Sequence, residues 1–314
     1  MNQPADIDPE ILAARALQAA VTPGLDVTAL EPAAARRLLN QMVASLNDGQ
    51  PELLNVETLF IDGPAGPLRA RLYQPAEATG KGAIYYIHGG GWFACDVDTH
   101  DGLLRALADK SGLSVFAIDY RLSPEHVFPA ALEDCLAGWR WLRAQAPRLG
   151  IGENIAVAGD SAGANLALAV MITQRDAGQK LPAAAALLYG CFAPNLRTAS
   201  RERYGAGAYG LTGPRMDWYW ANYLGPHAAV PPGLAAPLHA DFRGLPPCYI
   251  GTGECDVLAD DSRLVTDRMR EAGVDVTLDV WPGLTHGVLQ MTRDVRAARE
   301  VVTRIARRLA AWTT

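Results

Sequence analysis

The sequence predicts an α/β protein with a mostly parallel central sheet and helices on both of its faces. From residue 83 onward, short apolar and aromatic runs alternate with longer helical runs, the order that a parallel sheet with crossover helices requires. A hairpin is expected before them at residues 59–75, with Gly63 and Gly66 in its turn. Of the 314 residues, 49 % are hydrophobic and 20 % charged, so the chain can bury a large core.

The elements follow one another regularly until one segment interrupts them. Residues 8–47 are expected to be helical, with a proline near each helix start. Strands are expected at 83–87, 114–120, 154–160, 184–190, 247–253 and 276–281, and helices at 98–112, 129–150, 163–178, 261–273 and 292–312. An aromatic-rich helical piece at 195–240 breaks the alternation. We expect 1–50 to form N-terminal cap helices, 195–240 a cap insertion, and 51–194 with 241–314 the core.

The composition narrows the class of protein. The net charge is −6, with no basic run, which argues against a nucleic-acid partner. Five scattered cysteines without a C-x-x-C pair indicate free thiols in a reducing compartment. The N-terminus has no basic and apolar signal segment, and no apolar run has the length of a membrane span. We expect a cytoplasmic protein without membrane contact, and no histidine spacing predicts a metal site.

The stretch NIAVAGDSAGANLAL, residues 154–168, joins an expected strand to an expected helix. It contains G-x-S-x-G, in which Ser161 and Asp160 lie between Gly159 and Gly163. The motif is typical of a sharp turn that exposes a serine hydroxyl above a sheet. Side chains at the two glycine positions would collide with neighbouring backbone. The serine precedes a helix whose dipole favours negative charge, so Ser161 is the candidate nucleophile.

A serine nucleophile needs a base, and the base needs an orienting acid. Asp256 and His286 each follow an expected strand, in the chain order serine, acid, histidine. Active-site residues of parallel sheets gather at these strand ends. Glu254, Asp260 and Asp261 are rival acids, but the last two are expected to begin the following helix. The predicted catalytic residues are therefore Ser161, Asp256 and His286.

The stretch AIYYIHGGGW, residues 83–92, leaves a strand through His88 and three glycines. Bare backbone at this point would let amide hydrogens approach the oxyanion of an acyl-transfer intermediate. We expect the amides of Gly89, Gly90 and Ala162 to form the oxyanion hole. Gly91 is expected to shape the turn, and His88 to hold the loop by hydrogen bonds.

Seven segments carry a family resemblance. They are HGGGW (88–92), DTHD (98–101), DYRLSPEHVFPAALED (119–134), GDSAGAN (159–165), DFRGLPP (241–247), ECDVLADD (254–261) and GLTHG (283–287). In content and order they resemble the hormone-sensitive-lipase-like bacterial carboxylesterases, often called family IV. The resemblance implies the α/β-hydrolase fold with a helical cap, and hydrolysis of short-chain esters, acetyl to about hexanoyl, through an acyl-enzyme without a cofactor. It also implies a small-molecule ester substrate and a possible homodimer.

The pocket is harder to predict. Trp92, Cys191 and Tyr219 are candidates to line it, although each also suits a packed core position. The resembled family usually has glycine where this chain has Ala164, and often where it has Cys95. These two departures bear on the range of substrates.

Three other functions compete with a general esterase. Gly89, Gly91 and Ala94 after a strand, with Asp119 ending the next strand, also fit a dinucleotide-binding pattern, but that pattern leaves the serine, acid and histidine unexplained. A binding protein of the same fold without turnover is a second alternative. A deacetylase of one acetylated sugar or metabolite is the third.

Overall fold

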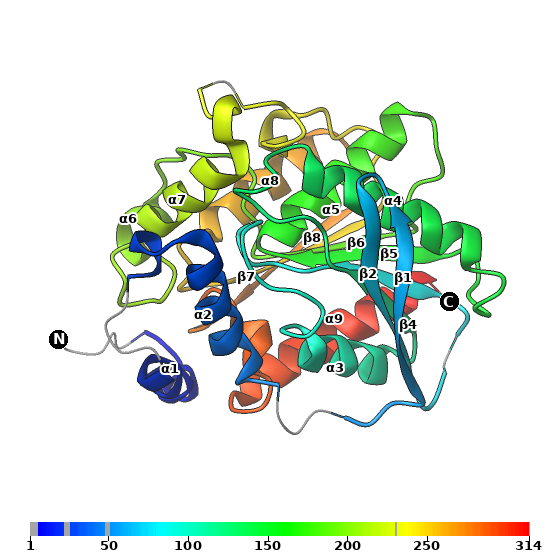
Figure 1. Ribbon diagram of the computed structural model, residues 1–314, viewed down its shortest axis with the longest axis horizontal. Coiled ribbons are helices and arrows are strands. Elements are labelled where there is room, and N and C mark those ends of the chain that lie inside the picture. The colour runs from blue at the N-terminus through cyan, green and yellow to red at the C-terminus, as the bar shows by residue number, and fades with distance from the viewer. Residues whose placement is uncertain (1–5, 22–25, 48–50, 79, 230, 314) are drawn as a thin grey trace.

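The computed structural model describes residues 6–21, 26–47, 51–78, 80–229 and 231–313, and it is built around one eight-stranded sheet (Figure 1). The strands are β1 (Asn55–Gly63), β2 (Gly66–Gln74), β3 (Ala83–Ile87), β4 (Ser114–Ile118), β5 (Ile155–Asp160), β6 (Ala185–Leu188), β7 (Cys248–Gly253) and β8 (Val276–Trp281). Their order is β1-β2-β4-β3-β5-β6-β7-β8. Among the strands of the described ranges, only β2 pairs antiparallel with its neighbours, and every other pair is parallel. The predicted α/β-hydrolase sheet is confirmed.

Helices cover both faces of the sheet, as predicted. They are α1 (Pro9–Val21), α2 (Pro32–Ala44), α3 (Asp101–Ser111), α4 (Ala130–Gln145), α5 (Ala162–Asp176), α6 (Ala199–Tyr204), α7 (Gly213–Leu224), α8 (Ala259–Glu271) and α9 (Arg296–Thr313). In Figure 1, α4, α5 and α8 lie on one face and α3 and α9 on the other. The central strands β3, β5, β6 and β7 are buried along their length, as expected for parallel strands packed on two sides.

Two helices begin more than one residue later than predicted, each for a local reason. The segment expected to be helical from residue 98 forms α3 only from Asp101, because Asp96 accepts bonds from the amides of Asp98 and Thr99 and holds them in a turn. The final helix starts at Arg296 instead of Thr292, after a 3-10 helix at Val288–Met291.

The N-terminal residues and the 195–240 segment meet at one side of the molecule. Asp6 accepts hydrogen bonds from Tyr209 at 3.0 Å and Arg203 at 3.1 Å, and Arg15 donates to the carbonyl of Ala208 at 3.0 Å. Figure 1 shows α2, α6 and α7 gathered on this side.

Helix α2 is fastened to the loop that follows β3 by side-chain hydrogen bonds. Arg36 Nε donates to the carbonyl of Phe93 at 2.7 Å, and its guanidinium also pairs with Glu125 at 2.6 Å. Asn40 Oδ1 accepts from the amide of Cys95 at 2.8 Å. The glycine loop is therefore held between the sheet and α2.

Candidate active site

Ser161 lies at the turn between β5 and α5. Its backbone has φ 53° and ψ −119°, a conformation that costs energy and that surrounding contacts must hold. The Ser161 amide donates to the carbonyl of Leu188 at 2.8 Å, which ties the turn to β6. A Cβ on Gly163 would collide with the carbonyl oxygen of Ile87, so the close packing of α5 on β3 requires glycine at that position.

Ser161, His286 and Asp256 lie in one hydrogen-bonded line. His286 Nε2 is 3.0 Å from Ser161 Oγ, and His286 Nδ1 is 2.9 Å from Asp256 Oδ2. Asp256 is fully buried, and its second oxygen accepts from the amide of Leu258 at 2.8 Å. A carboxylate oxygen can only accept, so the Nδ1 hydrogen points to Asp256 and Nε2 faces the serine hydroxyl. The structure thus brings together three side chains that lie far apart in the sequence.

The rival acids are engaged elsewhere. Glu254 accepts from the amide of Gly283 at 3.1 Å, and Asp260 accepts from the amide of Ser200 at 2.9 Å. Asp261 accepts from the amide of Phe192 at 3.2 Å. Burial raises the pKa of Asp261 to about 8, so this carboxyl is mostly uncharged at neutral pH and adds little negative charge beside Asp256.

The glycine loop differs from the prediction at one residue. The amide of Gly89 donates to Asp160 Oδ1 at 2.9 Å, so its hydrogen is already bound, and the expectation that Gly89 serves as an oxyanion donor is wrong. Gly90 and Gly91 line the cavity above Ser161. Among the residues that the structure describes, none accepts a hydrogen bond from the amides of Gly90, Gly91 or Ala162. Gly90 and Gly91 in the cavity wall and Ala162 next to Ser161 are therefore the candidate oxyanion donors.

Asp160 is buried beside the glycine loop and contacts several polar groups at once. Besides the Gly89 amide, its Oδ1 accepts from Tyr86 at 2.9 Å and lies 3.2 Å from His100 Nε2. Burial alone would raise the pKa of Asp160, but the charge and hydrogen bonds of its partners lower it below its ordinary value. An ionised Asp160 therefore fixes the glycine loop in place from below.

His88 supports the same loop, in the place predicted for it. Its Nδ1 donates to the carbonyl of Gly89 at 2.7 Å, and its ring stacks on Tyr120 with 4.2 Å between centroids. Burial, with the neighbouring His100, lowers the pKa of His88 to about 4. The imidazole is therefore neutral at physiological pH.

A cavity of about 150 Å³ opens over the serine. We call it the Ser161 cavity. Its wall is largely apolar and comes from both sides of the site: Leu39, Val43, Gly90, Gly91, Ala94, Cys95, His100, Asp160, Ser161, Tyr189, Leu211, Met216, Tyr219, His286, Gly287 and Gln290. Helices α2 and α7 thus face the sheet edge across a space that is smaller than the roughly 300 Å³ of a drug-sized ligand pocket.

Of the three predicted pocket residues, only Tyr219 lines this cavity. Trp92 is fully buried and stacks on Tyr223 with 4.1 Å between centroids, and Cys191 is fully buried elsewhere in the core. The prediction that Trp92 and Cys191 line the pocket is therefore wrong, because both side chains are packed in the core.

The two departures from the family pattern differ in position. Cys95 lines the cavity with φ 72°, the left-handed region that favours glycine. Ala164 is buried against Gly190 and is absent from the cavity wall. Of these two residues, only Cys95 therefore lines the cavity in which a substrate would bind.

Sequence reasoning missed several wall residues. His100 is not among the predicted site residues, yet it lines the cavity and contacts Asp160. Its place in the DTHD segment is the signal that could have found it. The apolar residues Leu39, Val43, Leu211 and Met216 and the polar Gln290 had no motif to mark them.

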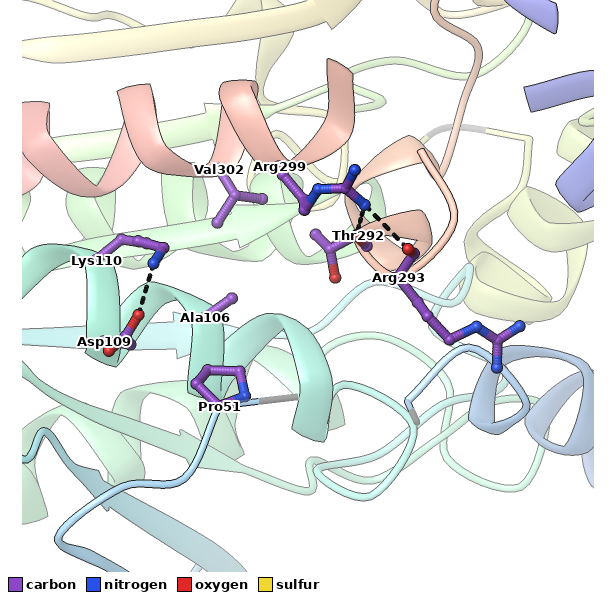
Figure 2. A pocket seen from close by; sticks show the side chains of 8 residues that line it. All are labelled: Pro51, Ala106, Asp109, Lys110, Thr292, Arg293, Arg299 and Val302. Atoms are coloured by element: carbon purple, nitrogen blue, oxygen red, sulfur yellow. Dashed lines mark hydrogen bonds and ion pairs between the residues drawn. The ribbon is translucent and has the colours of Figure 1, made fainter. Parts of the chain in front are cut away.

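A second cavity lies between α3 and α9 and is larger, about 340 Å³ (Figure 2). Its charges are paired: Lys110 with Asp109 at 2.9 Å, and Arg299 with the carbonyls of Thr292 and Arg293 at 2.8 and 2.9 Å. The eight lining residues include no histidine. The larger volume therefore does not make this cavity the active site. The Ser161 cavity is the better candidate, because it contains the serine and histidine that the reaction needs.

Comparison with known proteins agrees with this geometry. A family model for the alpha/beta hydrolase fold matches residues 84–290. The chain is 33 % identical to an ethyl acetate hydrolase of Pseudomonas putida, over 88 % of this chain and 89 % of the relative. It is 33 % identical to an acetyl esterase of Salmonella paratyphi B, over 79 % and 78 %. A hyperthermophilic esterase from Pyrobaculum calidifontis superimposes with a TM-score of 0.90 at 32 % identity, over 97 % and 98 %.

The fold and the serine, histidine and aspartate arrangement are those of an α/β-hydrolase. The chain belongs to this family and is a carboxylic ester hydrolase of the hormone-sensitive-lipase-like group, as the motifs predicted. Within the described ranges, each helix is too short or too polar for a membrane span.

Proposed function

We propose that the chain hydrolyses short-chain acyl esters through an acyl-enzyme on Ser161. The observation that carries this proposal is the line Asp256, His286, Ser161, with 2.9 and 3.0 Å between neighbouring atoms, facing free backbone amides. The small, mainly apolar cavity and the names of two relatives, ethyl acetate hydrolase and acetyl esterase, favour small acyl groups.

In the first half of the reaction, His286 Nε2 takes the hydroxyl proton as Ser161 Oγ attacks the ester carbonyl. Asp256 accepts the Nδ1 hydrogen throughout and stabilises the imidazolium that forms. The oxyanion binds to the amides of Gly90, Gly91 and Ala162. The tetrahedral intermediate collapses, His286 returns the proton to the leaving oxygen, and the alcohol departs.

In the second half, His286 takes a proton from water, which attacks the acyl carbonyl of the acyl-enzyme. The same amides hold the second oxyanion. Collapse breaks the bond to Ser161 Oγ, which regains its proton from His286. The carboxylic acid leaves, and the site returns to its starting state without a cofactor.

Helices α1, α2, α6 and α7 are proposed to act as a cap. The N-terminal residues and the 195–240 segment bond to each other through Asp6, and α2 and α7 both line the Ser161 cavity. The cap therefore limits the size of the ester. Cytoplasmic location and dimerisation remain predictions, and gel filtration of the purified protein tests the second.

The test is a series of p-nitrophenyl esters from acetyl to decanoyl with the wild type and with Ser161→Ala. We expect the highest kcat/KM between acetyl and about hexanoyl, and a loss of roughly 10³ to 10⁶ in kcat for Ser161→Ala. An unchanged melting temperature would show that the variant is folded. Tight binding by the wild type without turnover would instead favour a binding protein, and a preference confined to one acetylated sugar would favour the deacetylase.

A further inference from the structure

Gln290 places an unpaired amide in the wall of the Ser161 cavity. It lines the same space as Ser161 and His286, and its exposed fraction is 9 %. Its Nε2 is buried and has no hydrogen-bond partner within the described ranges. A side-chain amide carries two donor hydrogens and an acceptor oxygen, so this position offers unused hydrogen-bonding capacity beside the nucleophile.

The backbone around Gln290 is rigidly held. Residues Val288–Met291 form a 3-10 helix that begins two residues after His286, and the amide of Gln290 donates to the carbonyl of Gly287 at 3.1 Å. Val288, Leu289 and Met291 are apolar and pack into the core on the α9 side. Gln290 is the one polar residue of this turn, and it is the one that reaches the cavity wall.

An unpaired buried amide is costly for a fold. Its neighbours in the wall do not relieve the cost: Asp160 is occupied by Tyr86, His100 and the Gly89 amide, and the nearby cap residues Leu39, Val43 and Met216 are apolar. The missing partner is most simply a group that enters the cavity with the substrate. Because Nε2 can only donate, such a group must accept a hydrogen bond from it, as a hydroxyl oxygen can.

We propose that Gln290 is a specificity-determining residue that hydrogen-bonds a second polar group of the substrate, so that preferred substrates are short esters carrying a hydroxyl near the scissile carbonyl. This rests on the proposed ester hydrolysis at Ser161. A site that bonds a substrate hydroxyl discriminates against the analogue that lacks it, because the buried protein group is then left unpaired. A plain aliphatic ester is expected to react more slowly for this reason.

The test compares two pairs of esters in which a hydroxyl replaces a methyl group of similar size. 2-Hydroxyethyl acetate against propyl acetate places the hydroxyl on the alcohol side. Ethyl lactate against ethyl 2-methylpropanoate places it on the acyl side. For each pair, the ratio of kcat/KM for the hydroxylated ester to that for the plain ester is measured in the wild type and in Gln290→Met. Comparing the two proteins cancels the difference in intrinsic reactivity between the esters.

We expect Gln290→Met to lower this ratio about tenfold in one of the two pairs, and the affected pair identifies the side that Gln290 contacts. Gln179→Met, the same change at an exposed position outside the cavity wall, should leave both ratios unmoved. Equal ratios in wild type and Gln290→Met for both pairs would overturn the proposal.

A second measurement covers the case in which Gln290→Met does not fold. The dissociation constants of all four esters are determined with folded Ser161→Ala protein, which binds without turnover. The hydroxylated ester of one pair should bind more tightly, and equal affinities within both pairs would overturn the role of Gln290. Failure of the proposed function has a different signature, because the wild type would then hydrolyse none of the four esters.

Discussion

The Ser161 cavity has two sides that are built by different means. On the sheet side, Ser161, Asp256 and His286 follow strands or sit beside them, and the main-chain ladders of β5, β7 and β8 fix their positions. On the cap side, the wall comes from α2 and α7, and side-chain bonds such as those of Arg36 hold α2 in place. Changes on the sheet side should therefore alter the rate of chemistry, and changes on the cap side the choice and affinity of esters.

The largest effect is expected at Asp256. Asp256→Asn keeps the shape of the side chain but can donate to His286 Nδ1, which favours the tautomer whose Nε2 carries a hydrogen and cannot accept the serine proton. We expect kcat to fall roughly 10⁴-fold with little change in KM. Steady-state kinetics on p-nitrophenyl acetate would check this. A change mainly in KM would contradict the division between the two sides.

A second prediction concerns the pH dependence of stability on the sheet side. The unfolded chain protonates His88 below about pH 6.5, whereas the folded chain, with a pKa of about 4, does so only at lower pH. Protons therefore favour the unfolded state in this window, and the free energy of unfolding falls as pH drops from about 6.5 to 4, by up to about 3 kcal/mol.

Urea unfolding at several pH values measures this effect. In His88→Gln the slope of stability against pH should be smaller across that window. His227→Gln, at an exposed histidine, is the matched control and should keep the wild-type slope. Equal slopes in the two variants would show that His88 does not carry the effect.

The junction between the two sides is the third place to test. Arg36→Met removes the hydrogen bonds to Phe93 and Ser123 and the ion pair with Glu125. The glycine loop keeps its bonds to Asp160, so we expect KM to rise about three- to tenfold with kcat nearly unchanged. Arg37→Met, at an exposed position on the same helix, is the control. A large loss of kcat in Arg36→Met would mean that the cap also positions the reacting groups.

The smallest effect is expected at Cys95. Cys95→Gly removes the strain of a left-handed backbone at a residue with a side chain. It also removes a packed thiol and raises the conformational entropy of the unfolded chain. Because these effects oppose one another, the free energy of unfolding should change by less than about 1 kcal/mol. The added space should shift the preferred acyl chain upward. Thermal unfolding and the acyl-chain series measure both. An unchanged chain-length profile would indicate that Cys95 does not limit the acyl group.

Much of the sheet side was predictable from the sequence because its chemistry follows from strand ends and short motifs. Short local patterns in the sequence locate the G-x-S-x-G turn, the strand before His88, and Asp256 and His286 after their strands. In the structure these residues lie at the expected strand ends, and Ser161, His286 and Asp256 are hydrogen-bonded. The hydrogen bond from the Gly89 amide was not predictable, because its acceptor Asp160 lies 71 residues away in the sequence. Only the folded sheet brings the two residues together.

The cap side could be predicted only as segments. Helical periodicity locates α2 and α7, but it does not say which side chains turn toward the cavity. Trp92 illustrates this: an aromatic residue beside the glycine loop suggested a pocket, and stacking on Tyr223 buries it instead. Gln290 had no motif, and only its unpaired amide marks it.

Asp6 and Asp8 have partners that are synthesised much later than they are. Asp6 accepts hydrogen bonds from Arg203 and Tyr209, and the amide of Asp8 donates to the carbonyl of Gly283. These contacts can form only after the later residues have left the ribosome. The same holds for the hydrogen bond between Ser161 and His286, which joins residues 125 positions apart, so the catalytic arrangement is completed late in synthesis.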